Sequence, residues 1–157
     1  MNIPVFTLDR LHKKIGKDIK KIVGKVIDSN SYSAGVETEK FQEALADYCG
    51  VKYCLACNNG TTALIAAVKA FERMTENFYL SSPNTFTATS EAIFQGYNRS
   101  LLFVDTDKTG NIDIIKVKPQ EKDVIVPINL YSNPVNLIKL KELNKNTKYY
   151  TILDNCQ

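Results

Sequence analysis

Apolar residues recur every three or four positions over several long segments of the chain, and this spacing predicts amphipathic helices. The segments span residues 9–28, 36–49, 61–73, 85–95 and 136–143. Gly50 and Gly96 each directly follow one of them, and glycine at such a position commonly ends a helix. Shorter apolar runs with the length of strands lie at residues 53–57, 78–81, 100–104, 124–127 and 147–153.

The order of these elements predicts the fold class. From residue 51 onward strands alternate with helices, which is typical of an α/β domain with a mostly parallel sheet and crossover helices. The stretch 105–120 is polar, with a turn expected at Thr109 and Gly110. We therefore expect an N-terminal helical segment at residues 1–50 and a sheet domain at residues 51–157.

The first helical segment is basic as well as amphipathic. Its cations are Arg10, Lys13, Lys14, Lys17, Lys20, Lys21 and Lys25. Such a helix binds a membrane surface or a phosphate backbone, or it docks by its apolar face as a surface helix, which is the more common arrangement. Because the formal net charge is only +3, we expect neither a nucleic acid nor a membrane as partner.

Localisation and metal binding are constrained by what the sequence lacks. No apolar run approaches the ~20 residues that cross a bilayer, and residues 1–5 do not begin a recognisable signal peptide, so the cytoplasm is expected. Cys54 and Cys57 form a C-x-x-C, but their spacing in a strand would direct them to opposite faces. His12 is the only histidine. We expect no metal site and no redox centre.

A candidate anion site follows the first predicted strand. Residues 58–64 read Asn-Asn-Gly-Thr-Thr-Ala-Leu and lead into the helix predicted at residues 61–73. A helix start presents unpaired backbone N–H groups and a partial positive charge, and Thr61 and Thr62 add hydroxyls beside Gly60. These features favour a phosphate group, although a well-capped helix without a ligand has the same pattern.

Other polar or aromatic residues also come directly after predicted strands. They are Thr85, Phe86, Asp105, Tyr131 and Asp154. In open α/β sheets, ligands bind beyond the carboxyl ends of the strands. We therefore expect these residues and the Gly60 turn to border one pocket.

In order and spacing, these pieces resemble the DegT/DnrJ/StrS family of sugar aminotransferases. The family's Gly-Thr-Ala-Leu turn, Pro-x-x-Thr-Phe-x-Ala-Thr turn and Phe-Val-Asp strand end are similar to residues 60–64, 83–89 and 103–105. Its Leu-Tyr-Gly-x-Pro turn and Glu-Asp-Ala-Ala-Gln strand end are similar to residues 130–134 and 153–157. The resemblance covers the whole chain and implies fold-type I of the enzymes that depend on pyridoxal 5'-phosphate (PLP). The chain would form an incomplete large domain of that fold.

The resemblance also implies roles for individual residues. It implies that Gly60, Thr61 and Thr62 bind the cofactor phosphate and that Phe86 stacks on the cofactor ring. It further implies that Asp154 keeps the pyridine nitrogen protonated, because a neighbouring carboxylate favours the charged form. Gln157 would approach the ring hydroxyl. Without the family pattern, Phe86 would be interpreted as a core residue and Asp154 as a helix cap.

Several positions depart from the family pattern. Asn129 and Ser132 stand where the His and Gly of a His-Leu-Tyr-Gly turn are usual, and Leu153 stands where Glu often precedes the Asp. Residues 76–79 lack the usual Gly-Asp-Glu. The Schiff-base lysine of the family follows its Asp-x-x-Gln element, and no lysine here matches it. We therefore expect no catalytic residue within residues 1–157 and non-covalent cofactor binding at best.

The resemblance implies that the complete enzyme moves an amino group from an amino-acid donor, expected to be glutamate, to a keto sugar carried on a nucleotide. It also implies a homodimer. Two alternatives are a non-catalytic remnant that binds phosphate or a partner, and an unrelated nucleotide-binding α/β domain. The absence of G-x-G-x-x-G and G-x-x-x-x-G-K-[ST] argues against the second. The sequence does not specify the sugar or the carbon that is aminated.

The resemblance carries one expectation about folding. In the implied fold, the strand at residues 53–57 pairs with the last, antiparallel strand of the large domain, which would lie beyond residue 157. An apolar strand without a partner leaves backbone groups unpaired and invites aggregation. We therefore expect residues 1–157 on their own to be marginally stable.

Overall fold

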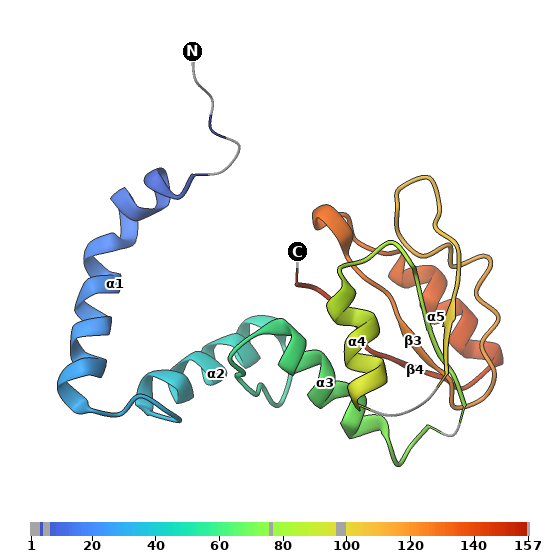
Figure 1. Ribbon diagram of the computed structural model, residues 1–157, viewed down its shortest axis with the longest axis horizontal. Coiled ribbons are helices and arrows are strands. Elements are labelled where there is room, and N and C mark those ends of the chain that lie inside the picture. The colour runs from blue at the N-terminus through green and yellow to red at the C-terminus, as the bar shows by residue number, and fades with distance from the viewer. Residues whose placement is uncertain (1–3, 5–6, 76, 97–99, 157) are drawn as a thin grey trace. The chain divides into compact units, whose positions relative to one another are not determined.

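The computed structural model describes residues 4, 7–75, 77–96 and 100–156 (Figure 1). The chain divides into two compact units, Met1–Ala56 and Cys57–Gln157. Among the described helices, none combines the length and apolar content that crossing a bilayer requires.

The first unit contains two helices, α1 (Asp9–Ser29) and α2 (Val36–Cys49). Both predicted helices are confirmed. Gly50 ends α2 in the left-handed conformation (φ 64°), and its N–H bonds to the carbonyl groups of Ala46 and Asp47. A residue without a side chain adopts this conformation at little cost, which explains why the helix stops there.

The prediction of a strand at residues 53–57 is wrong, because these residues have an irregular backbone. Tyr53 and Leu55 are 77% and 79% exposed. A strand requires a partner beside it, and none of the described strands pairs with this run. The backbone N–H of Ala56 instead bonds to the side-chain oxygen of Gln42 at 2.8 Å. Residues 53–57 are mostly apolar, as the prediction assumed. Apolar residues form a strand, however, only where a neighbouring strand pairs with their backbone.

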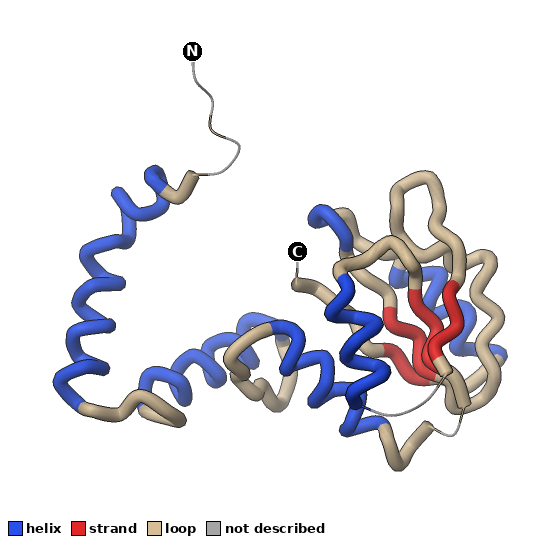
Figure 2. Tube along the Cα trace, viewed as in Figure 1, coloured by secondary structure: helices blue, strands red, loops and turns tan. Residues whose placement is uncertain are grey.

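The second unit is built on a four-stranded sheet in the order β2-β1-β3-β4, drawn in red in Figure 2. Its strands are β1 (Tyr79–Ser81), β2 (Leu101–Phe103), β3 (Val124–Val126) and β4 (Tyr150–Thr151). All neighbouring pairs are parallel, so the predicted parallel α/β sheet is confirmed. The strands are shorter than predicted because the flanking residues lie outside the ladders.

Helices connect and cover these strands. α3 (Gly60–Phe71) precedes β1, α4 (Thr87–Gly96) joins β1 to β2, and α5 (Leu137–Asn146) joins β3 to β4. A short 3-10 helix, η1 (Leu130–Ser132), follows β3 and was not predicted. The polar connection from β2 to β3 turns at Gly110 (φ 85°), and a bridge joins Thr106 to Ile112.

Hydrophobic cores lie on both faces of the sheet, because successive strand residues point to opposite sides. On β3, Val124 and Val126 join the core that includes residues of α3 and α4, whereas Ile125 joins the core that includes residues of α5. The helices α3 and α4 approach closely at Gly96, where an added Cβ would lie 2.6 Å from Val68 Cγ1. Glycine is therefore required there for packing.

The strand order creates a switch point between β1 and β3. From β1 the chain first moves outward to β2, then returns past β1 to β3 and continues to β4. Connections therefore leave the carboxyl ends of β1 and β3 in opposite directions. Such a point is where open α/β sheets hold their ligands.

Candidate functional site

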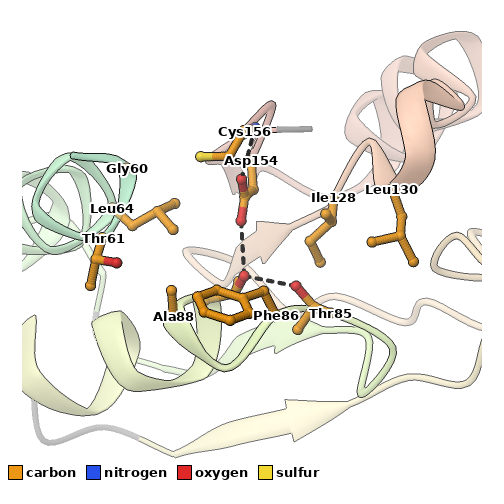
Figure 3. Close-up of a pocket in the computed structure, with 11 residues that line it drawn as sticks. Gly60, Thr61, Leu64, Thr85, Phe86, Ala88, Ile128, Leu130, Asp154 and Cys156 are labelled. Carbon is orange, nitrogen blue, oxygen red and sulfur yellow. Dashed lines mark hydrogen bonds between the residues drawn. The ribbon is translucent and has the colours of Figure 1, made fainter. Parts of the chain in front are cut away.

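A cavity of about 260 Å³ lies at the carboxyl ends of the strands, within the second unit (Figure 3). The segments that form it are the starts of α3 and α4 and the chain after β3 and after β4. The lining residues are Gly60, Thr61, Leu64, Thr85, Phe86, Ala88, Thr89, Ile128, Leu130, Asp154 and Cys156. The sequence prediction of a pocket at this edge of the sheet therefore has a matching cavity.

The N-terminus of α3 presents backbone donors to this cavity. Asn59 caps the helix: its Oδ1 accepts from the N–H of Thr62 at 2.8 Å, and its carbonyl accepts from Ala63 at 3.2 Å. Among the described residues, the N–H groups of Gly60 and Thr61 have no protein acceptor. Two free donors at the positive end of a helix are suited to binding an anion.

Gly60 is also constrained by its surroundings. A Cβ at this position would lie 2.8 Å from the sulfur of Cys156, which is closer than real Cβ atoms come to another heavy atom. The start of α3 therefore meets the segment after β4 at close range. A larger residue at position 60 would have to move the side chain of Cys156.

Phe86 provides an aromatic surface at the edge of the cavity. It directly precedes α4 and is 68% exposed, and Figure 3 shows its ring facing the space between the segments. An aromatic side chain this exposed contributes little to the core. Leu64, Ile128 and Leu130 supply further apolar lining, so the cavity combines an apolar wall with a few polar groups, as small-molecule sites usually do.

Asp154 is the buried charged group of the cavity, with 6% exposure. Its Oδ2 accepts from the hydroxyl of Thr89 at 2.8 Å, and its Oδ1 accepts from the N–H of Cys156 at 3.2 Å. Its backbone is fixed as well, because its N–H donates to Pro127 and its carbonyl accepts from Asn129, both at 3.0 Å. The side chain is therefore held at a defined place beside β3.

The Asp154 carboxylate has no cationic partner among the described residues, whose ion pairs are Lys40–Glu37, Lys116–Asp105 and Lys116–Asp113. Buried charges are usually paired, because removing a charge from water is costly. A buried carboxylate that faces a cavity without a cation is suited to a positively charged ligand group.

Cys156 is a lining residue that the sequence did not single out as part of the site. Its hydrogen bond with Asp154, together with partial burial, raises the pKa of the thiol to about 11. The thiol therefore stays protonated at neutral pH and is a poor nucleophile there. Its position two residues after Asp154 was the only sequence signal that could have located it.

The structure brings together some of the residues predicted for the site but not all of them. Gly60, Thr61, Phe86 and Asp154 line the one cavity, whereas Thr62 is exposed on α3 and does not line it. Gln157 lies outside the described residues. Of the other residues that follow strands, Asp105 and Tyr131 do not line the cavity.

Asp105 is occupied elsewhere. It pairs with Lys116 at 2.9 Å, and this contact lowers the pKa of its carboxyl. Tyr131 is 79% exposed and has a positive φ of 53°, as does Ser132 (58°). Two successive non-glycine residues in this conformation are uncommon, and Ser132 stands where glycine is usual in the turn of the family that the sequence resembles.

Thr89 is the second residue that sequence reasoning missed. It lies one helical turn after Thr85, a spacing that places both on one side of the start of α4. That spacing was visible in the sequence. Its hydrogen-bond partner was not, because Thr89 and Asp154 are 65 positions apart.

Comparisons with known proteins agree with this geometry. The chain is 26% identical over 158 residues to the dTDP-3-amino-3,6-dideoxy-alpha-D-galactopyranose transaminase of Aneurinibacillus thermoaerophilus, covering 99% of this chain and 44% of that protein. It matches the structure of NtdA from Bacillus subtilis with bound cofactor PMP at a TM-score of 0.86 and 25% identity, covering 99% and 37% of the two chains.

A third match is a GDP-4-keto-6-deoxymannose-3-dehydratase structure with a trapped PLP-glutamate geminal diamine. Its TM-score is 0.77 and its identity 25%, and the match covers 87% of this chain and 38% of that one. The chain therefore spans about two fifths of the length of the relatives that it matches.

The parallel sheet and its structural neighbours define part of the fold-type I architecture, and structures among these neighbours hold PLP or PMP. The model of the DegT/DnrJ/EryC1/StrS aminotransferase family matches residues 13–157. The chain belongs to that family.

Proposed function

We propose that this chain forms the PLP-binding part of an aminotransferase that acts on nucleotide-linked keto sugars. The observation that carries the proposal is the Asp154 carboxylate, which is buried, has no cationic partner among the described residues and borders the same cavity as the α3 N-terminus. PLP, when bound, supplies an electron sink for chemistry at an amino group. It carries a phosphate and a basic ring nitrogen, which match these two features.

The phosphate would lie at the start of α3. The free N–H groups of Gly60 and Thr61 support this assignment, since a helix N-terminus favours an anion. Thr62 is included by resemblance, although its own N–H is used by the Asn59 cap. The exposed ring of Phe86 is proposed to stack on the cofactor ring.

The ring nitrogen would lie at Asp154. A carboxylate stabilises the protonated form of a neighbouring base, and it does so more strongly in a buried site than in water. Gln157 is assigned to the ring hydroxyl by resemblance alone. No lysine lines the cavity in the part of the chain that the structure describes, so a polypeptide of residues 1–157 should bind PLP without a covalent link and should not transaminate on its own.

The remaining parts of the proposal concern the whole enzyme. The names of the relatives support a nucleotide-linked sugar as substrate, and the matched structure that traps PLP with glutamate supports glutamate as the amino donor. We also propose a homodimer and a cytoplasmic location. Dehydration is the competing reaction, since one of the matched proteins is a dehydratase.

The test is a PLP titration of residues 1–157 followed by absorbance, with dialysis to measure affinity. We expect saturable binding that Asp154→Ala weakens about tenfold, the size expected for losing a charge-assisted contact. Asp47→Ala, which removes an exposed carboxylate of α2, is the matched control and should change nothing. Borohydride reduction followed by peptide mapping should label no single lysine stoichiometrically.

Three outcomes would contradict the proposal. Stoichiometric labelling of one lysine would show a covalent site within these residues. An unchanged affinity in Asp154→Ala would remove Asp154 from the site. If inorganic phosphate displaces PLP fully and Asp154→Ala has no effect, the chain is a phosphate-binding remnant instead.

A further inference from the structure

The carboxylate of Asp154 is held by a side chain from another element. Thr89, in the first turns of α4, is 2% exposed and donates its hydroxyl to Oδ2 of Asp154 at 2.8 Å. The oxygen of Thr85 lies 2.9 Å from the same hydroxyl, and Figure 3 draws both hydrogen bonds as dashed lines between Asp154 and Thr85. These two hydrogen bonds link the start of α4 to the segment after β4.

The direction of these bonds follows from their chemistry. An ionised carboxylate only accepts, so the single proton of Thr89 is used toward Asp154. The hydroxyl of Thr85 must then donate to Thr89. Thr85 also lines the cavity, so its remaining lone pairs make it an acceptor for a ligand.

We propose that Thr89 is the positioning residue of this site: it fixes the Asp154 carboxylate in the orientation that receives the positively charged ring nitrogen of PLP. This inference rests on the proposed function. Without Thr89, the carboxylate would keep, among the described residues, only its contacts with Cys156: the 3.2 Å bond from the N–H and the contact with the thiol. Terminal carboxylate torsions are soft, and both of these contacts come from a residue only two positions along the same segment. The side chain of Thr89 is rigid by comparison, because it is β-branched and buried.

The hydrogen bond of Thr89 is also of the stronger kind. A bond from a hydroxyl to a carboxylate is charge-assisted and is about twice as strong as a bond between neutral groups. Thr89→Val keeps the shape of the side chain and removes the hydroxyl, which donates to Asp154 and accepts from Thr85. Thr89→Ser restores the donor with a smaller side chain.

The first arm of the experiment compares PLP with its 1-deaza analogue, which has carbon in place of the ring nitrogen. In residues 1–157, Thr89→Val should weaken PLP binding about fivefold to tenfold and leave binding of the analogue unchanged, and Thr89→Ser should recover most of the loss. In an Asp154→Asn background, Thr89→Val should add little. Equal losses for both ligands would mean that Thr89 acts on the general structure of the cavity, which would overturn the inference.

The second arm needs no ligand. A double-mutant cycle of Thr89→Val and Asp154→Ala, followed by urea unfolding, should show a coupling of about tenfold in the unfolding equilibrium constant. The matched control is Thr75→Val, because Thr75 is 1% exposed and its hydroxyl has no partner among the described residues. That variant should be neutral or stabilising.

The two arms separate the inference from the proposed function. If the wild-type chain does not bind PLP but the cycle shows coupling, the proposed function fails and Thr89 still fixes Asp154. If the cycle shows no coupling, Thr89 does not hold Asp154, and the inference is overturned whatever PLP does.

Discussion

The helices α1 and α4 differ in opposite directions in two properties: the regularity of their apolar pattern and the burial of their side chains. α1 is 21 residues long, separates apolar from basic residues sharply, and has no buried residue among those described. α4 has 10 residues and a less regular pattern, yet Ala88, Thr89, Ala92, Ile93 and Gly96 are all buried. A strong amphipathic pattern therefore predicts a helix, but it does not predict what covers the helix.

The difference arises from what surrounds each helix within its own unit. α4 is the crossover helix that connects the parallel strands β1 and β2, and its residues pack against the sheet and against α3. Within the described part of the first unit, no such layer covers the apolar residues of α1, such as Ile22 (46% exposed) and Ile27 (54% exposed). Helical structure in α1 thus depends on local propensity, whereas in α4 it depends on tertiary packing.

The largest expected effect tests burial directly. Ile93→Ala should reduce the free energy of unfolding by about 3 kcal/mol, because it leaves a cavity at a residue that is 1% exposed. Ile22→Ala should cost less than about 0.5 kcal/mol, as is usual at exposed positions. Urea unfolding of the two variants measures both values. Equal losses would mean that α1 is covered to the same degree as α4.

A second pair of variants uses one substitution in both helices. Gly96→Ala should cost about 1–2 kcal/mol, since the new Cβ would lie 2.6 Å from Val68 Cγ1 in a packed core. Gly24→Ala in α1 meets nothing within 4 Å, and it should stabilise that helix by up to about 1 kcal/mol. The changes in helix content, measured by circular dichroism, and in urea midpoint should have opposite signs in the two variants. Changes of the same sign in both variants would contradict the difference between the two helices.

The smallest expected effect is a pH dependence of the second unit. Burial raises the pKa of Tyr149, and the Asp154 contact raises the pKa of Cys156 to about 11. A raised pKa means that the folded state holds the proton more tightly, so this stability is complete below the ordinary values of 9.0 and 10.0 and is lost as the pH rises past them.

The measurement compares urea midpoints at pH 8 and pH 11. The midpoint should fall at the higher pH, and it should fall less in a variant that carries both Tyr149→Phe and Cys156→Ala. If the double variant loses as much stability as the wild type, these two groups do not carry the effect.

The local parts of the fold were predictable from the sequence. The bounds of α2 were predicted correctly, because Gly50 marks the end of the helix and the apolar spacing marks its length. Residues 53–57 were predicted wrongly because a strand is defined by its partner, which a run of apolar residues does not reveal. The positive φ angles of Tyr131 and Ser132 were also missed, since residues with side chains rarely adopt them.

The candidate site was predictable where one segment carries the signal. The Gly60 turn and Phe86 each lie at the start of a helix, and this position is visible locally. The role assigned to Asp154 came from family resemblance. Its bond to Thr89 could not be predicted, because it depends on how the sheet brings α4 beside the segment after β4.

The 65 positions between Thr89 and Asp154 also have a consequence for synthesis. A ribosome adds roughly 5–20 residues per second, so Thr89 emerges about 3–13 s before its partner. During that interval α3, α4 and the first strands can assemble. The segment after β4, which carries Asp154 and Cys156 of the cavity lining, has not yet been made. The cavity therefore forms only after the segment that follows β4 has been made, and a cofactor that needs the Asp154 carboxylate can be captured only after β4 has joined the sheet.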